Sequence, residues 1–180
     1  MDTDYWHRKW QADDIGFHQA EGNPLLHAHF NELSLPVGSR VFVPLCGKTR
    51  DIAWLLSQGY RVAGAELSEL AIQQLFAELG LEPAVATIGG MKHYSATDVD
   101  IFVGDIFHLT RKMLHPVDAV FDRAALVALP EDMRTRYAGH VSEITGQAPQ
   151  LLVTFEYDQT QMAGPPFSIS DEDVHNYYQD

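Results

Sequence analysis

The sequence predicts an α/β fold, in which a mostly parallel central sheet carries helices on both faces. Three observations lead to this prediction. Short apolar segments of strand length alternate with helical segments of about 10–15 residues, which is the pattern of β–α–β units. The chain of 180 residues is long enough for one domain with a sizeable core. Apolar residues make up 46% and charged residues 21%, as in ordinary globular proteins.

Five segments are predicted to be the strands of this sheet, because each is short and apolar. They are residues 40–45, 60–67, 100–107, 117–123 and 150–157. Since the strands are expected to be parallel, a ligand should bind where their carboxyl ends meet. The residues that directly follow each strand are therefore the candidates for a functional site.

Helices are predicted between the strands and near both ends of the chain, at residues 4–16, 23–33, 49–59, 68–80, 130–146 and 170–180. Cap residues support several of them: Ser68 and Gly80 bound one helix, and Ser170 with Asp173 forms a capping pattern. We expect a single domain over 1–180, made of an N-terminal helical segment (1–34), a core (40–157) and a partial C-terminal segment (158–180).

The net charge of −13 and the pI near 4.9 disfavour nucleic acid and anionic membranes as partners. No apolar run approaches the roughly 20 residues that span a bilayer, and the acidic, aromatic N-terminus lacks the apolar stretch of a signal peptide. Cys46 is the single cysteine, so no internal disulfide forms. We expect a cytoplasmic monomer that acts on a small molecule.

The segment VFVPLCGKT (41–49) ends in Gly-Lys-Thr, like a phosphate-binding P-loop. A P-loop needs a further glycine five residues before Gly47, and Phe42 stands there. Pro44 also removes an amide donor from the approach to the loop. The three-glycine dinucleotide pattern is missing as well. A P-loop hydrolase and a pyrophosphate ligand are therefore disfavoured.

Two acidic residues stand at predicted strand ends. Glu66 ends the second strand about 20 residues past the loop, where a carboxylate can accept hydrogen bonds from ribose hydroxyls. Asp105 lies at the end of the third strand, where it can meet an adenine. This arrangement indicates a nucleoside ligand such as S-adenosylmethionine (SAM). It places a loop after the first strand, a carboxylate that can bind a ribose after the second and a carboxylate at the end of the third, and it has no pyrophosphate site. The alternative is that both are solvated carboxylates at strand ends.

His27 and His29 raise the question of a metal site. Because no cysteine or acidic residue stands at ligand spacing from them, we expect no metal. Cys46 lies beside the loop, but nothing near it in the sequence marks it as a nucleophile. We expect it to be a small buried filler.

Five blocks, in the expected order over nearly the whole chain, resemble the bacterial type of the thiopurine S-methyltransferase family. The blocks are YWHRKWQADDIGFHQAEGNPLL (5–26), VFVPLCGKTRDIAWLLSQGYRVAGAELSE (41–69), GDIFHL (104–109), FDRAALVALP (121–130) and EYDQTQMAGPPFSI (156–169). The resemblance implies a Rossmann-like class I methyltransferase fold with an N-terminal helical lid. It also implies transfer of a methyl group from SAM to sulfur, leaving S-adenosylhomocysteine (SAH).

The resemblance further implies which residues hold the cofactor. Leu45 would contact SAM through the loop backbone, and Glu66 would hold the ribose. The full implied set is Trp6, Trp10, Leu45, Gly47, Glu66, Asp105, Ile106 and Arg123. Asp105 and Ile106 would flank the adenine. The face of Trp10 suits contact with the sulfonium or its methionine part, because an aromatic face attracts a cation.

For the methyl acceptor, the resemblance implies that Phe17 borders it and that Arg123 steers an anionic or thiolate group. Asp122 is the second catalytic candidate, as a proton acceptor. Other interpretations remain open: Trp6 and Trp10, four residues apart, could form an apolar helix face that packs on the core. Phe17 could equally be a core residue, and Arg123 could pair with Asp122 or another acid.

The acceptor itself stays open, because the predicted pocket is built from generic apolar residues. Thiopurines, other thiols, and tellurium or selenium oxyanions all supply a soft nucleophile. A SAM-binding protein without catalysis is a further alternative. Class I methyltransferases usually end with an antiparallel strand pair, and the five predicted strands leave no sequence for it before Asp180. We therefore expect that pair to be absent, so that either the chain is a truncated form or the sheet has an open edge that needs cover.

Overall fold

The structure is a computed structural model that describes residues 3–12, 14–16, 19 and 21–178. It contains a seven-stranded sheet with the order β3-β4-β5-β2-β1-β6-β7. Only β4 runs against the other strands of this described sheet, because its pairings with β3 and with β5 are both antiparallel. The predicted α/β fold with a mostly parallel sheet is confirmed.

The strands are β1 (Arg40–Pro44), β2 (Arg61–Glu66), β3 (Ala84–Ile88), β4 (Met91–Ala96), β5 (Val99–Val103), β6 (Ala119–Arg123) and β7 (Gln150–Val153). The α-helices are α1 (Thr3–Gln11), α2 (Pro24–His29), α3 (Arg50–Ser57), α4 (Glu69–Leu79), α5 (Arg111–Leu114), α6 (Glu131–Thr145) and α7 (Asp171–Tyr177). Three short 3₁₀ helices are described: η1 (Phe30–Leu33), η2 (Ile106–His108) and η3 (Leu126–Ala128). None of the described helices combines the length and the apolarity needed to cross a bilayer.

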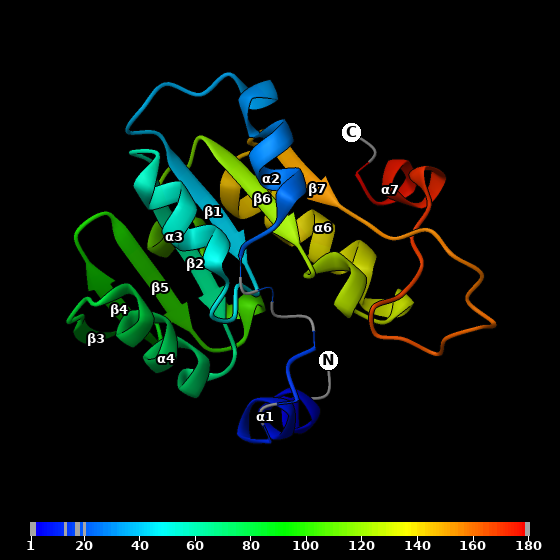
Figure 1. Ribbon diagram of the computed structural model, residues 1–180, viewed down its shortest axis with the longest axis horizontal. Coiled ribbons are helices and arrows are strands. Elements are labelled where there is room, and N and C mark those ends of the chain that lie inside the picture. The colour runs from blue at the N-terminus through cyan, green and yellow to red at the C-terminus, as the bar shows by residue number, and fades with distance from the viewer. Residues whose placement is uncertain (1–2, 13, 17–18, 20, 179–180) are drawn as a thin grey trace.

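Two hydrophobic cores lie on the two faces of the sheet. Helices α2, α3 and α4 stand in front of the sheet in Figure 1, and α6 stands behind it. All five residues of β1 are buried, and its side chains alternate between the cores: Val41 and Val43 join the core of α2–α4, whereas Phe42 joins that of α6. A strand that is buried on both faces explains why this segment reads as a continuous apolar run.

The predicted helix caps are confirmed. The Ser68 side chain accepts a hydrogen bond from the backbone of Ala71, and Gly80 ends α4 in the left-handed conformation (φ 66°). At the other end of the chain, Ser170 and Asp173 form a reciprocal capping box at the start of α7. These local contacts fix where the helices begin and end.

The prediction of five strands was wrong, because β3 and β4 were missed. They form an antiparallel hairpin that turns at Gly89 and Gly90 and pairs through β4 with β5. All residues of β3 are exposed, so no half-buried alternation marked the strand. The Gly-Gly turn, with φ of 58° and 85°, was the signal available in the sequence. This hairpin forms one edge of the sheet and β7 forms the other.

Several predicted elements are shorter than expected, among them the N-terminal helix, which spans Thr3–Gln11 rather than residues 4–16. The third strand ends at Val103 rather than at residue 107, because Gly104 (φ 149°) turns the chain and Asp105 caps η2. The last strand ends at Val153, and the helix expected over 23–33 changes to the 3₁₀ helix η1 at Phe30. These shifts move Asp105 from a strand end into a loop that starts a helix.

The tight packing of the central strands gives a first prediction. A Cβ atom at Gly64 would lie 2.7 Å from Ile101 Cδ1 and 3.0 Å from Cys46 Sγ, all within the buried core. Overpacking a core costs about 1–3 kcal/mol, so Gly64→Ala should lower the free energy of unfolding by that amount in urea titrations.

Gly139 supplies the matched control, because it lies in α6 with no atom within 4 Å of an added Cβ. Gly139→Ala should raise the free energy of unfolding by about 0.5–1 kcal/mol through helix propensity. Equal effects of the two substitutions would contradict the packing described for β2.

Candidate functional site

A cavity of about 420 Å³ opens at the carboxyl edge of the central strands. It is lined by Val43 near the end of β1, by Glu66 and Arg123 at the ends of β2 and β6, and by side chains of α1, which close one side. In Figure 1, α1 lies beyond the arrowheads of the central strands, at the foot of the sheet. This volume is in the range of small-molecule sites, and the position is the one where open parallel sheets bind ligands.

The loop after β1 forms the floor of the cavity. Leu45 (φ 46°) and Gly47 (φ 51°) both adopt the left-handed conformation, which a leucine rarely does. The ring of Trp10 lies against Gly47, where an added Cβ atom would come within 2.8 Å of Trp10 Cζ2. A glycine is therefore required for α1 to approach the loop this closely. Trp10 is buried, and Trp6 is half-buried at the cavity wall.

Glu66 joins this loop to the end of β2. Its side chain is buried, and its two carboxylate oxygens accept hydrogen bonds from the backbone N–H groups of Gly47 and Ser68, both at 2.8 Å. Burial raises the pKa of Glu66, and the bonds from these amides oppose that shift. The alternative of a solvated strand-end carboxylate is excluded. Each oxygen keeps capacity for a further donor, and the residue lines the cavity.

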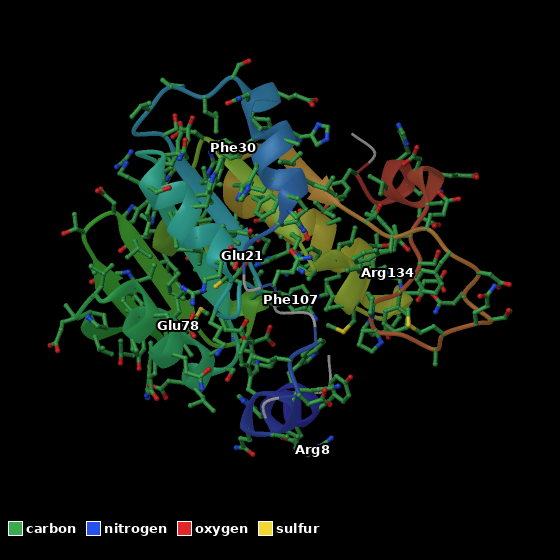
Figure 2. The ribbon with its side chains drawn as sticks, in the orientation of Figure 1. Arg8, Glu21, Phe30, Glu78, Phe107 and Arg134 are labelled. Atoms are coloured by element: carbon green, nitrogen blue, oxygen red, sulfur yellow. The ribbon has the colours of Figure 1, made fainter. Side chains whose placement is uncertain are left out.

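Lys48, the lysine of the Gly-Lys-Thr sequence, pairs with an acid outside the loop. Its Nζ lies 3.2 Å from Glu78 Oε1, and Arg50 Nε lies 3.6 Å from the other oxygen. Figure 2 labels Glu78 on α4, in front of the sheet. A lysine held in this way does not present its charge as the lysine of a P-loop does.

Arg123 ends β6 on the side of β1 opposite to Glu66, and it lines the cavity. Burial lowers the pKa of its guanidinium, and the charge of Asp51 acts in the opposite direction. Asp51 is buried, accepts hydrogen bonds from Asn23 N–H (2.6 Å) and the Thr49 hydroxyl (2.8 Å), and also lines the cavity. The acid near Arg123 on the cavity side is therefore Asp51.

Asp51 was missed in the sequence. It is an acid in the first turn of the helix that follows the cavity loop, a position that stabilises many helices without any further role. Its hydrogen bond with Asn23 joins residues that are 28 positions apart in the sequence, so this contact is visible only in the folded structure.

Asp122 lies on the other face of β6. It is fully buried, and its carboxylate accepts hydrogen bonds from the Tyr137 hydroxyl (2.7 Å) and Leu126 N–H (3.2 Å). Burial raises its pKa to about 6. Asp122 is not among the described residues that line the cavity, so the structure does not place it to take a proton from a ligand there.

Asp105 and Ile106, the residues predicted to flank the adenine, lie one strand further from the loop after β1 than Glu66 does. Asp105 accepts a hydrogen bond from Phe107 N–H (3.0 Å) and caps η2, whereas Ile106 is buried in the core on the α6 face. Both follow β5, the neighbour of β2, but neither is among the described residues that line the cavity. Phe17, the predicted acceptor residue, lies outside the described residues.

His27 and His29, which raised the question of a metal site, contact an aromatic ring and a carboxylate respectively. The ring of His27 stacks on Trp54 at 4.7 Å, and His29 Nδ1 lies 2.6 Å from Glu32 Oε1. Within the described part of the chain, no three His, Cys, Asp or Glu residues gather closely enough to hold a metal ion. Cys46 is buried, and burial raises the pKa of its thiol well above the ordinary value. It therefore stays protonated, which is unfavourable for a nucleophile.

An apolar wall completes the cavity. Phe155, Pro165 and Pro166, from the segment after β7, line it together with Val127 and Ala128 of η3. No positional signal in the sequence predicts this wall, because the segment after β7 has no regular secondary structure up to α7. The cavity therefore combines a buried acid, a half-buried cation, aromatic rings and an apolar wall.

Comparisons with known proteins agree with this geometry. The family model described as "Thiopurine S-methyltransferase (TPMT)" matches residues 1–180. A relative from Xanthobacter autotrophicus named thiopurine S-methyltransferase is 59% identical over 99% of this chain and 84% of its own length. One of the same name from Teredinibacter turnerae is 52% identical over 99% of this chain and 83% of its own length.

Solved structures show a similar fold. A SAM-dependent methyltransferase from Anabaena variabilis superposes with a TM-score of 0.70 at 14% identity, covering 99% of this chain and 80% of that one. A TehB-like SAM-dependent methyltransferase from Corynebacterium glutamicum gives 0.61 at 14% identity, with 98% and 80% covered. With the match of the family model over the whole sequence, these findings show that the chain belongs to the thiopurine S-methyltransferase family.

Proposed function

We propose that this protein transfers the methyl group of SAM to the sulfur of thiopurines or related aromatic and heterocyclic thiols. Membership of the family makes it a methyltransferase with SAM as its cofactor. The observation that carries the proposal is the placement of Glu66 and Arg123 on either side of β1, at one cavity. In this proposal, Glu66 binds the ribose of SAM and Arg123 attracts the anionic thiol.

The described residues fit SAM. The carboxylate of Glu66 can accept hydrogen bonds from ribose hydroxyls while it keeps its bonds to Gly47 and Ser68. The buried ring of Trp10 beside the loop offers an aromatic face to a cationic group. When bound, SAM supplies a methyl group activated by its positively charged sulfur. Asp105 and Ile106, at the start of η2 after β5, are the proposed neighbours of the adenine.

The chain's own residues provide positioning and charge. Arg123 would favour the thiolate form of an acceptor, because a nearby cation lowers the pKa of a thiol. A thiolate is already a nucleophile, so the site needs no general base. Trp6 and Trp10 on α1 would exclude water from the reacting atoms. The apolar wall suits the flat ring of an aromatic acceptor, and Phe17 is the further residue that we propose to border it.

A methyl-transfer assay tests the proposal. The protein is incubated with SAM and, separately, with 6-mercaptopurine, 4-nitrothiophenol, tellurite or selenite, and methylated products and SAH are measured by mass spectrometry. We expect methylation of both aromatic thiols, at rates above those for the oxyanions. Methylation of the oxyanions alone would show that the acceptors are tellurium or selenium oxyanions rather than aromatic thiols. SAH binding with no methylation of any acceptor would indicate a binding protein without catalysis.

Glu66→Gln tests the ribose assignment. An amide has one acceptor oxygen, so the substitution leaves Gly47 or Ser68 N–H unpaired and weakens the bond to a ribose hydroxyl. We expect SAH affinity, measured by calorimetry, to fall about 10–100-fold. Glu69→Gln is the matched control, because Glu69 pairs with Lys92 and Tyr94 outside the cavity. Unchanged affinity in Glu66→Gln would rule out the ribose assignment.

Arg123→Met tests acceptor steering, because methionine keeps much of the side-chain length and removes the charge. We expect kcat/KM for 4-nitrothiophenol to fall at least about 100-fold, with a smaller change in SAH affinity. The control is Arg50→Met, since Arg50 is an exposed arginine that pairs with Glu78 outside the cavity. Equal losses in the two variants would contradict a specific role for Arg123.

A further inference from the structure

The turn after β6 holds Arg123 at the cavity by means of an unusual backbone conformation. Ala124 follows Arg123 with a φ of 62°, in the left-handed region that favours glycine. Both residues line the cavity. An alanine in this conformation relaxes unless surrounding contacts hold it, so the direction of Arg123 depends on what fixes the turn.

Asp122 supplies that contact from the opposite face of the strand. One oxygen of its carboxylate accepts the N–H of Leu126, which spans the turn from residue 122 to the start of η3. The other oxygen accepts the hydroxyl of Tyr137 from α6. Asp122 and Tyr137 are both fully buried. A buried carboxylate is costly unless it is fully hydrogen-bonded, and here its bonds hold the turn.

The described hydrogen bonds of Asp51 and Arg134 are made with groups other than Asp122. Burial lowers the pKa of Arg123, and the charge of Asp51 on the cavity face opposes that shift. Arg134, labelled on α6 in Figure 2, donates to the carbonyl of Leu129 (2.9 Å) and lies 3.4 Å from the Tyr177 hydroxyl.

Tyr178 is the other titratable group that faces the Asp122 carboxylate. Its hydroxyl is buried, and it has no hydrogen-bond partner within the described part of the chain. The hydrogen bonds described for Asp122 thus come from Tyr137 and from the turn.

We propose that Asp122, held in place by Tyr137, is a positioning residue that directs Arg123 toward the thiolate acceptor by fixing the turn over residues 123–126. The inference rests on the proposed function, because that function makes an anionic thiolate the ligand of Arg123. It differs from the role of Asp122 as a proton acceptor, since Asp122 and the cavity lie on opposite faces of β6.

The proposal has a consequence for pH. Burial raises the pKa of Asp122 to about 6, and the bond from Tyr137 acts to lower it. As the pH falls through this value, the carboxylate gains a proton and accepts the amide of Leu126 less strongly, because bonds to a charged acceptor are stronger. The turn loosens, and the affinity for a thiolate falls. Removing the Tyr137 hydroxyl raises the pKa of Asp122 further, so this loss of affinity moves to higher pH.

The experiment measures equilibrium binding of 4-nitrothiophenolate to the SAH-saturated protein from about pH 5.5 to about pH 8, where this acidic thiol stays ionised. In the unmodified protein we expect affinity to fall at low pH with a midpoint near the pKa of Asp122. In Tyr137→Phe the midpoint should rise by about one pH unit. Tyr94→Phe is the matched control, because it removes a tyrosine–carboxylate bond to Glu69 outside the cavity, and its midpoint should not move.

The Asp122→Asn variant should bind the thiolate about tenfold more weakly at pH 8. Its curve of thiolate affinity against pH should no longer show the midpoint. If this variant does not fold, as judged by thermal unfolding, Tyr137→Phe decides the question. An unchanged midpoint in Tyr137→Phe would overturn the positioning role. Absence of thiolate binding to the unmodified protein at every pH would instead overturn the proposed function.

Discussion

The candidate site depends on one buried carboxylate at the end of β2. Glu66 accepts the N–H groups of Gly47 and Ser68, so a single side chain fixes the loops that follow two neighbouring strands. Gly47 in turn leaves room for the ring of Trp10, which brings the N-terminal helix against the cavity. The carboxylate keeps acceptor capacity on the cavity side. The contact that builds the floor is thus also the group proposed to hold the ribose.

On the other side of β1, two acids act on Arg123 in different ways. Asp51 faces the cavity and offsets the cost of burying the guanidinium, whereas Asp122 lies behind the strand and holds the following turn. The alternation of side chains along β6 decides this division, because Asp122 and Arg123 are adjacent and must point to opposite faces. Asp122 and Arg123 are adjacent in β6 and therefore contribute to one site from opposite faces of the sheet.

The parallel core could be predicted because its strands are buried on both faces and its helices carry strong caps, as at Ser68 and Ser170. The hairpin of β3 and β4 could not be found from periodicity, since β3 is exposed throughout. Glu66 was predictable because a strand end fixes its position. The positions of Asp51 and of the wall at Pro165 depend on tertiary contacts that leave no local pattern.

The most direct test of the central claim is a crystal structure of the protein in complex with SAH. We expect a ribose hydroxyl within hydrogen-bonding distance of the Glu66 carboxylate, with the Gly47 and Ser68 amides still bonded to it. The thioether should lie between the loop after β1 and Arg123. A complex in which the ribose bonds elsewhere and Glu66 contacts only the two amides would contradict the account, because Glu66 would then be a structural residue alone.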